Sequence, residues 1–170
     1  MADLTRGRVI AKVRAGESLE GADLSGLDIT GANLSSGDLK RANLNGANLT
    51  GAYLTGTHLE GASLERADLK SARLRSANLS DANLSGAKLI RTDMSGANLS
   101  GANLRDADLS EANLWKANLT GANLLHANLT RALMAMANLK NANLKQADLT
   151  EAKLIRAELS DTILPESFKK

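Results

Sequence analysis

A repeat of five residues is the feature that most constrains how this chain can fold. Residues 96–130 read GANLSGANLRDADLSEANLWKANLTGANLLHANLT, so that Ala, then Asn or Asp, then Leu return with two variable residues after each Leu. With Leu as the centre, the register runs unbroken from Glu17 to Glu166, thirty repeats in 150 of the 170 residues. The centre is Leu in 27 repeats, and Ala stands two places before it in 24.

A period of five fits neither a straight helix nor a straight strand. On an α-helix the Leu side chains would spiral round the axis, and on a strand successive Leu residues would point to opposite faces. Ala and Leu within one repeat are two apart, so they share a face if the segment is extended. The three-residue step to the next Ala must then contain a corner. The sequence therefore predicts short extended segments that turn the same way and stack as a coil, with Ala and Leu inside.

This pattern resembles the pentapeptide-repeat proteins, and Ile29, Met94 and Met134 are the only departures from Leu at the centre. The resemblance implies an all-β fold, a right-handed quadrilateral β-helix with four repeats and twenty residues in each coil. Thirty repeats would then give about seven and a half coils.

The two ends leave the register, which divides the chain into residues 1–16, 17–166 and 167–170. We interpret residues 1–16 as a helical cap over the first coil, since a solenoid end exposes apolar side chains and unpaired backbone groups. Thr5 can begin the helix and Gly16 can end it. An organelle transit sequence is the alternative, because the segment is basic. At the other end, Phe168 is predicted to cover the last Leu residues.

The residue two places after each Leu is the predicted corner, and it holds 11 of the 14 glycines. The same position also holds Arg41, Arg66, Met136 and Glu151. Because residues of this kind seldom adopt a positive φ, we predict that the corner does not generally require one.

Composition and spacing exclude several classes of function. There is no Cys, and His58 and His126 fall on different sides of the predicted coil and more than three coils apart, so no metal site, disulfide or catalytic pair is expected. No Gly-rich phosphate loop and no apolar run long enough for a membrane span are present. We therefore predict a non-enzymatic cytoplasmic protein without cofactors, metal, small-molecule substrate or membrane contact.

Stacking at twenty-residue spacing places outward residues in columns. Asn78, Asn98, Asn118 and Asn138 form one column, and Asn83, Asn103, Asn123 and Asn143 form another. Their amides are predicted to hydrogen-bond along the coil axis.

One side differs from the other three. We define the fourth face as the outward residues of the repeats centred on residues 34, 54, 74, 94, 114, 134 and 154. It concentrates large apolar and basic side chains against a single acid, Asp93, and such a surface usually marks an interface. The predicted partner-binding residues are Tyr53, Arg73, Arg75, Trp115, Lys116, Leu133, Met136, Ile155 and Arg156.

The favoured hypothesis is a non-catalytic scaffold or protein-interaction module that binds another protein or a second copy of itself. The family resemblance adds an alternative, because some pentapeptide-repeat proteins mimic DNA and engage DNA gyrase. Those proteins have strongly acidic surfaces and frequent Phe at the centre, whereas this chain has a net charge of +2 and no Phe there. Nucleic-acid binding along the basic side is a third hypothesis, without a recognised reading motif to support it.

Overall fold

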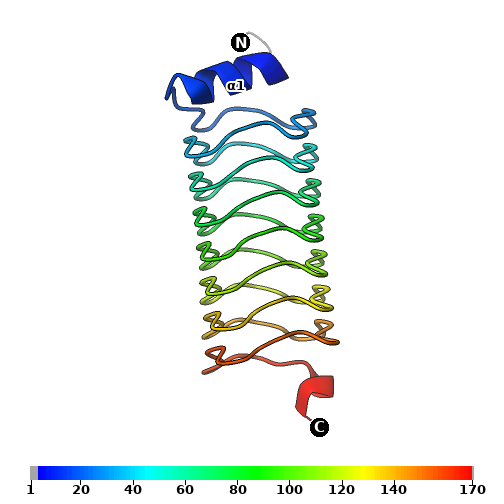
Figure 1. Ribbon diagram of the computed structural model, residues 1–170. Coiled ribbons are helices and arrows are strands. Elements are labelled where there is room, and N and C mark those ends of the chain that lie inside the picture. Colours follow the sequence, from blue (N-terminus) through cyan, green and yellow to red (C-terminus); the bar gives the residue numbers. More distant parts are fainter. Residues whose placement is uncertain (1–3, 170) are drawn as a thin grey trace.

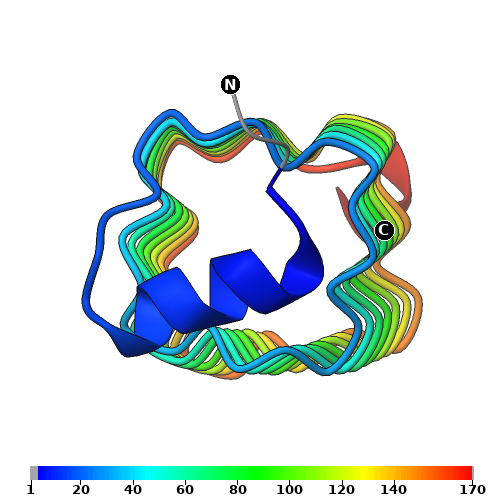
Figure 2. The same ribbon diagram turned by 90° about the horizontal axis from the view of Figure 1, so that it is seen from above.

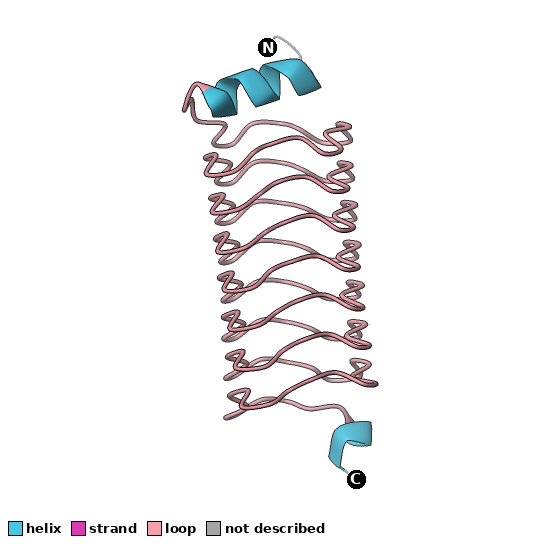
Figure 3. Ribbon diagram, viewed as in Figure 1, coloured by secondary structure: helices cyan, strands magenta, loops and turns pink. Residues whose placement is uncertain are grey.

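The computed structural model describes residues 4–169, which wind into a straight stack of coils with a helix at each end (Figure 1). Parallel bridges join each outward residue before a Leu to the residue twenty positions later, from Asp23 with Asn43 to Asn143 with Ile163. Each bridge involves single residues, and within the described part of the chain no longer strand forms, as Figure 3 shows. The twenty-residue coil predicted from the sequence is confirmed.

Seen along its axis, the stack has a four-sided outline (Figure 2). The fold is the predicted right-handed quadrilateral β-helix (Figure 2). Leu and Ala fill the interior, and Leu104 in mid-rod is fully buried. Its N–H donates to the carbonyl of Asn123 in the next coil at 2.7 Å, while the N–H of Asn103 donates to Ala82 in the previous coil at 2.9 Å. Each interior coil therefore bonds to both of its neighbours through the backbone.

Two of the three threonines at the Ala position are buried, and neither leaves its hydroxyl unpaired. The Thr57 hydroxyl donates to the carbonyl of Leu34 at 2.9 Å, and the Thr92 hydroxyl donates to Leu89 at 2.6 Å. Both residues are fully or almost fully buried. A buried hydroxyl with a carbonyl partner avoids the cost of an unsatisfied polar group, so these positions are packing adjustments in the core.

The prediction for the corner position was wrong. Every residue two places after a central residue from 21 to 161 has a positive φ, including 18 residues that are not glycine. Arg41 and Met136, with φ of 55° and 59°, are examples. Two hydrogen bonds fix this conformation at Met136. The Met136 N–H donates to Ile155 of the next coil at 2.9 Å, and the Ala137 N–H donates to Met134 within the same turn at 3.1 Å. Repeated bonding of this kind imposes a conformation that the side chains do not favour.

Helix α1, Arg6–Arg14, lies across the N-terminal end of the coil (Figure 2). The Thr5 hydroxyl accepts from the N–H of Arg8 and begins the helix. At its end the Gly16 N–H bonds to Val13 and the Glu17 N–H bonds to Lys12, the pattern of a Schellman cap. The helix buries Val9 completely in the core of the first coils. The predicted helical cap is therefore present, although residues 1–3 of the predicted segment lie outside the described residues.

The C-terminal end is closed less completely than the N-terminal end. The chain finishes in the 3-10 helix η1, Glu166–Lys169, and Pro165 before it is buried. Phe168, predicted to cover the last Leu residues, is instead 42% exposed, and Leu154 and Leu159 of the last coil stay half-buried. Phe168 lines a small hollow together with Leu149, so it covers the end of the coil only in part. Residue 170 of the predicted tail lies outside the described residues.

Candidate functional site

The fourth face brings its predicted residues together in consecutive coils. Asn113 bridges to Leu133, and Leu133 bridges to Lys153 one coil further on. In the adjacent turns the Lys116 N–H donates to Ala135, and the Met136 N–H donates to Ile155, at 3.1 and 2.9 Å. Trp115, Ala135 and Ile155 therefore occupy equivalent places in three successive coils.

The exposed apolar side chains of the rod gather on this face. Among the described residues, seven large apolar side chains are exposed, and five of them belong to the fourth face: Tyr53 (41%), Trp115 (44%), Leu133 (48%), Met136 (45%) and Ile155 (69%). The other two, Ile163 and Phe168, lie at the C-terminal end. Four of the five are in the C-terminal half of the rod, where they form a contiguous apolar patch of the kind that marks an interaction site.

The basic residues of this face form no ion pair among the described residues, although, after the hydrogen bond from Arg131, the positive charge of Lys153 helps to lower the pKa of Glu151. In the described part of the chain no ion pair involves Arg73, Arg75, Lys116, Lys153 or Arg156. Two of them lie over aromatic rings instead. The Arg73 guanidinium is 4.7 Å from the centroid of the Tyr53 ring, and the Lys116 ammonium is 4.3 Å from that of Trp115. These contacts orient the two cations but leave the positive charge of the face uncompensated.

In contrast, basic residues form ion pairs in the corner column beside the fourth face, which runs through positions 91, 111, 131 and 151. Arg91 donates to Glu111 at 2.8 Å, and Arg131 donates to Glu151 at 2.9 Å. The Arg91 guanidinium lowers the pKa of Glu111 by hydrogen bonding, and Arg131 does the same for Glu151. Opposite charges at twenty-residue spacing would have revealed these pairs in the sequence, but the sequence analysis did not align this column.

A shallow groove of about 430 Å³ follows the fourth face along the rod axis. Arg75 and Lys153 lie at its two ends, four coils apart, and Trp115, Leu133 and Ala135 line it between them. The remaining lining is polar and comes from Asp93, Ser95 and Asn113. Tyr53, Met136 and Ile155 are outside the groove. The candidate site is thus an apolar strip with a cation at either end.

A larger hollow, of about 690 Å³, lies at the C-terminal end where the last coil is incomplete. Lys145, Asp148, Ile163 and Glu166 are among the residues that line it. It lies where η1 follows the last repeat and no further coil stacks on Asp148.

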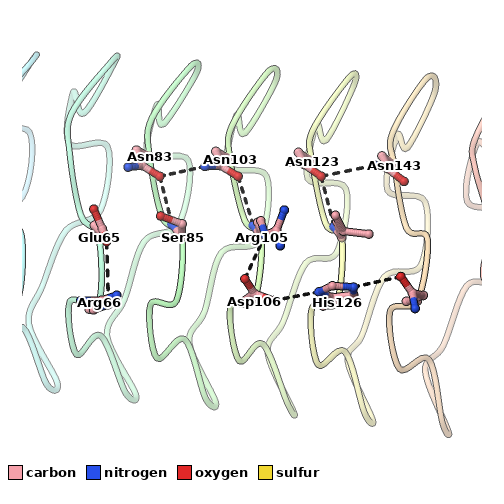
Figure 4. A network of polar contacts seen from close by, with 12 residues as sticks. Glu65, Arg66, Asn83, Ser85, Asn103, Arg105, Asp106, Asn123, His126 and Asn143 are labelled. Carbon is pink, nitrogen blue, oxygen red and sulfur yellow. Dashed lines mark hydrogen bonds and ion pairs between the residues drawn. The ribbon is translucent and has the colours of Figure 1, made fainter.

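The polar faces are occupied by bonds within the rod. Asn103 donates to Asn83 and Asn143 donates to Asn123, while each Asn oxygen also accepts the N–H two residues later (Figure 4). In the other column Asn98 donates to Asn78 and Asn118 donates to Asn98. The predicted ladders are confirmed for these pairs. No bond joins Asn103 to Asn123 or Asn118 to Asn138, so each ladder is interrupted once.

His126 belongs to a chain of side chains along one corner, which the sequence analysis missed. Its two ring nitrogens face Asp106 at 3.1 Å and Gln146 at 2.9 Å, and Arg105 donates to Asp106 at 3.0 Å (Figure 4). Hydrogen bonds from Arg105, then from His126, lower the pKa of Asp106. Because its two nitrogens contact residues of the coils on either side, the His126 imidazole links three successive coils.

Residues 4–169 contain no group of three His, Cys, Asp or Glu side chains placed to hold a metal ion. Over the same residues no helix has the length and apolar character needed to cross a membrane.

Comparison with solved structures identifies a pentapeptide-repeat protein, Rfr23 from the cyanobacterium Cyanothece 51142, as similar. It is 41% identical with a TM-score of 0.53, and the match covers 54% of this chain and 63% of that chain. HetL, a pentapeptide-repeat protein involved in heterocyst differentiation regulation from Nostoc sp. strain PCC 7120, is 29% identical over 96% of this chain and 98% of its own, with a TM-score of 0.45. QnrB1, a plasmid-mediated fluoroquinolone resistance protein, is 17% identical over 85% and 84%, with a TM-score of 0.42.

None of the curated proteins searched matches this chain. The sequence profile of the pentapeptide repeats, in contrast, matches in eight copies that extend over residues 16–167. The profile thus accounts for nearly the whole coil, in the register defined by Leu. The chain belongs to the pentapeptide-repeat family.

Proposed function

We propose that the protein is a non-catalytic interaction module whose fourth face binds another protein. The observation that carries this proposal is the gathering of Trp115, Leu133, Met136 and Ile155 on one face of an otherwise polar rod. Exposing this much apolar surface to water is unfavourable, and burying it against a partner lowers the free energy.

The composition of the face supports a protein partner in particular. Trp, Tyr and Arg are the residue types that contribute most to binding energy at protein interfaces, and this face holds Trp115, Tyr53, Arg73, Arg75 and Arg156. The apolar side chains lie along the strip while the cations surround it, an arrangement typical of an interface with an apolar centre and a polar rim. The rigid coil below also keeps the entropy lost on binding small.

The charge of the face disfavours the DNA-mimic hypothesis. Mimicry of a nucleic acid needs a continuous column of acids, whereas the fourth face has Asp93 alone and its other charges are positive. In the column of outward residues that runs from Asp28 to Asp148, Lys88 stands between Asp68 and Asp108. The protein-interaction hypothesis requires no such column.

Affinity capture with two matched variants tests the proposal. Trp115→Glu places a charge in the strip, and Leu125→Glu places one at the equivalent turn position on the opposite face, where Leu125 is half-buried. Both variants should keep the thermal midpoint of the native rod to within a few degrees. Capture from the source organism, quantified by mass spectrometry, should lose specific proteins with Trp115→Glu and retain them with Leu125→Glu. Identical captured sets for native protein and Trp115→Glu would reject the fourth face as the contact surface.

A further inference from the structure

We infer that the groove of the fourth face takes an extended, acidic and apolar segment of a partner protein, lying lengthwise along the rod. This inference rests on the proposed function and specifies the chemistry and direction of the partner. It follows from two features of the groove: which of its charges are left without partners, and how far apart the charges lie.

The charges require an acidic occupant. Arg75 and Lys153 at the groove ends are exposed, and neither is in an ion pair among residues 4–169, although Arg91 and Arg131 on the adjacent corner are both paired. Lys153 acts at longer range on Glu151, a carboxylate that already accepts from Arg131 at 2.9 Å. Lys116 and Arg156 add further unpaired positive charge beside the apolar strip. Of the groove's own groups only Asp93 is acidic, and its Oδ1 already accepts from the Ser95 N–H and the Asn113 amide, both at 3.1 Å. Electrostatic complementarity therefore selects a partner segment that carries carboxylates.

The spacing of the two end cations sets the length of the segment. Arg75 and Lys153 belong to coils four steps apart, which corresponds to about 19 Å at the usual strand separation of about 4.8 Å. An extended chain covers that distance in six residues, at about 3.3 Å per residue. Two acids at positions i and i+6 would then meet the two cations. Six is an even number, so both acids point to the same side of the extended segment.

The same geometry places apolar residues between the acids. Side chains at i+2 and i+4 share the side of the acids and face the middle of the groove. Trp115, Leu133 and Ala135 line that part of it together with Asn113, and the polar Asp93 and Ser95 lie in the coil next to Arg75. The matching segment is acid, any residue, apolar, any residue, apolar, any residue, acid.

The other occupants fit less well. A second copy of the rod meeting this one through the same face would bring five unpaired cations against five others. Single-stranded nucleic acid binds by stacking successive bases on aromatic rings, but Tyr53 and Trp115 are three coils apart, about 14 Å, with no aromatic residue between them on this face.

Trp115 makes the inference directly measurable, because it is the only tryptophan of the chain and lines the groove. The probe is the blocked peptide Asp-Ser-Leu-Ser-Leu-Ser-Asp, titrated into the full-length protein while tryptophan emission is followed. We expect a saturable blue shift, as the ring is covered. We also expect the apparent affinity to fall when salt is raised from about 0.05 to 0.5 M.

Three control peptides separate the elements of the inference. Replacement of both Asp by Lys should abolish the shift, replacement of both Leu by Ser should weaken it strongly, and Ser-Leu-Asp-Asp-Leu-Ser-Ser, of identical composition, should bind more weakly than the probe. Equal affinity for the Lys peptide would overturn the acidic occupant, and equal affinity for the rearranged peptide would overturn the lengthwise placement. No saturable shift with up to about 1 mM of the probe would overturn both. Tighter binding of a twelve-nucleotide single-stranded DNA would assign the groove to nucleic acid instead.

Matched variants locate the contact. The affinity for the probe peptide should fall by up to about fivefold in each of the variants Arg75→Gln and Lys153→Gln, as expected for loss of an exposed ion pair. Lys145→Gln, an unpaired exposed lysine on the opposite face, should leave its affinity unchanged. Unchanged affinity in both groove variants would overturn the inference. The peptide experiments could fail while Trp115→Glu still loses captured proteins, and this result would contradict the inference but not the proposed function. An unchanged set of captured proteins would contradict the proposed function itself.

Discussion

A Cβ atom added to Gly37 would lie 3.2 Å from Cγ1 of Val13 in the helical cap, and closer still, at 2.9 and 3.0 Å, to the carbonyl oxygen of Leu34 and Cδ1 of Leu39. Ala77 and Ala97 stand at the equivalent position two and three coils further on, and both are buried. Gly37 has no positive φ, so its role is close packing against its own turn and the cap, and not backbone freedom.

Gly37→Ala should therefore destabilise the rod although alanine is the rule at this position. The expected loss is about 1–3 kcal/mol, the usual cost of overpacking. Val13→Ala in the same chain should recover part of that loss by removing the methyl group in conflict. Denaturant titrations of the two single variants and the double variant measure the coupling. Strict additivity would mean that Val13 and Gly37 do not compete for space.

The stability lost when a core leucine is truncated should depend on its position along the rod. Leu104→Ala should cost about 2–5 kcal/mol because the side chain is fully buried between coils. Leu154→Ala in the half-buried last coil should cost clearly less. Asn103→Ser should cost about 1 kcal/mol, since it removes the amide bond to Asn83 but no core volume. Urea titration compares the three. Equal losses for Leu104→Ala and Asn103→Ser would contradict the inward placement of Leu104.

The turn geometry predicts opposite effects for two exposed glycines. Gly121 has a φ of +67° and free space around it, so Gly121→Ala should cost about 1 kcal/mol through backbone strain alone. Gly7 lies in helix α1 with equally free space, and Gly7→Ala should stabilise the cap by up to about 1 kcal/mol. Differential scanning calorimetry should show the thermal midpoint moving down for the first variant and up for the second. A neutral or stabilising Gly121→Ala would show that the turn can relax to a negative φ.

Carboxylates at the bridge positions predict a loss of stability in acid. The Thr30 hydroxyl, and then the Thr30 N–H, lower the pKa of Asp28 below its ordinary value of 3.8, and Thr150 acts in the same way on Asp148. A pKa lowered in the folded state means that the unfolded chain binds protons more readily. The stabilisation is thus complete above the unfolded value near 3.8, and it is lost as the pH falls through the lower folded value.

The double variant Asp28→Asn and Asp148→Asn isolates this effect. Asparagine keeps the oxygen that accepts from the Thr30 and Thr150 N–H groups, at 3.1 and 2.9 Å, and it does not titrate. Thermal midpoints should be nearly equal for variant and native protein at about pH 7 and should fall less for the variant below about pH 4. Parallel acid profiles for the two proteins would assign the acid sensitivity to other groups.

The sequence predicted the coil because Leu and Ala recur at fixed intervals, and burial of these two residue types dominates the fold. The twenty-residue stacking then placed Trp115 and Ile155 on the fourth face correctly, since register alone decides which side chains point outward. The corner conformation could not be read from residue preference. Hydrogen bonds from both neighbouring coils force Arg41 and Met136 to a positive φ, and these bonds are long-range.

The repeat pattern also could not predict contacts that depend on side-chain conformation. The contact of Lys116 with the Trp115 ring and the engagement of His126 with Asp106 and Gln146 depend on rotamers. The extent of cover by Phe168 could not be predicted because the repeat ends at Glu166, and the direction of η1 decides where the ring lies. The groove between Arg75 and Lys153 similarly emerges only when five coils are assembled.

Site-specific photo-crosslinking tests the central claim, that the fourth face is a protein-contact surface, most directly. A photoreactive phenylalanine analogue at position 115 is compared with the same analogue at position 125, at the equivalent turn on the opposite face, in cells of the source organism. The analogue at 115 should give a discrete protein adduct that is reduced when Arg75 and Lys153 are changed to Gln, and the analogue at 125 should not give that adduct. The same adducts from both positions, or none from position 115, would contradict the assignment of the fourth face as the surface through which this rod binds its partner.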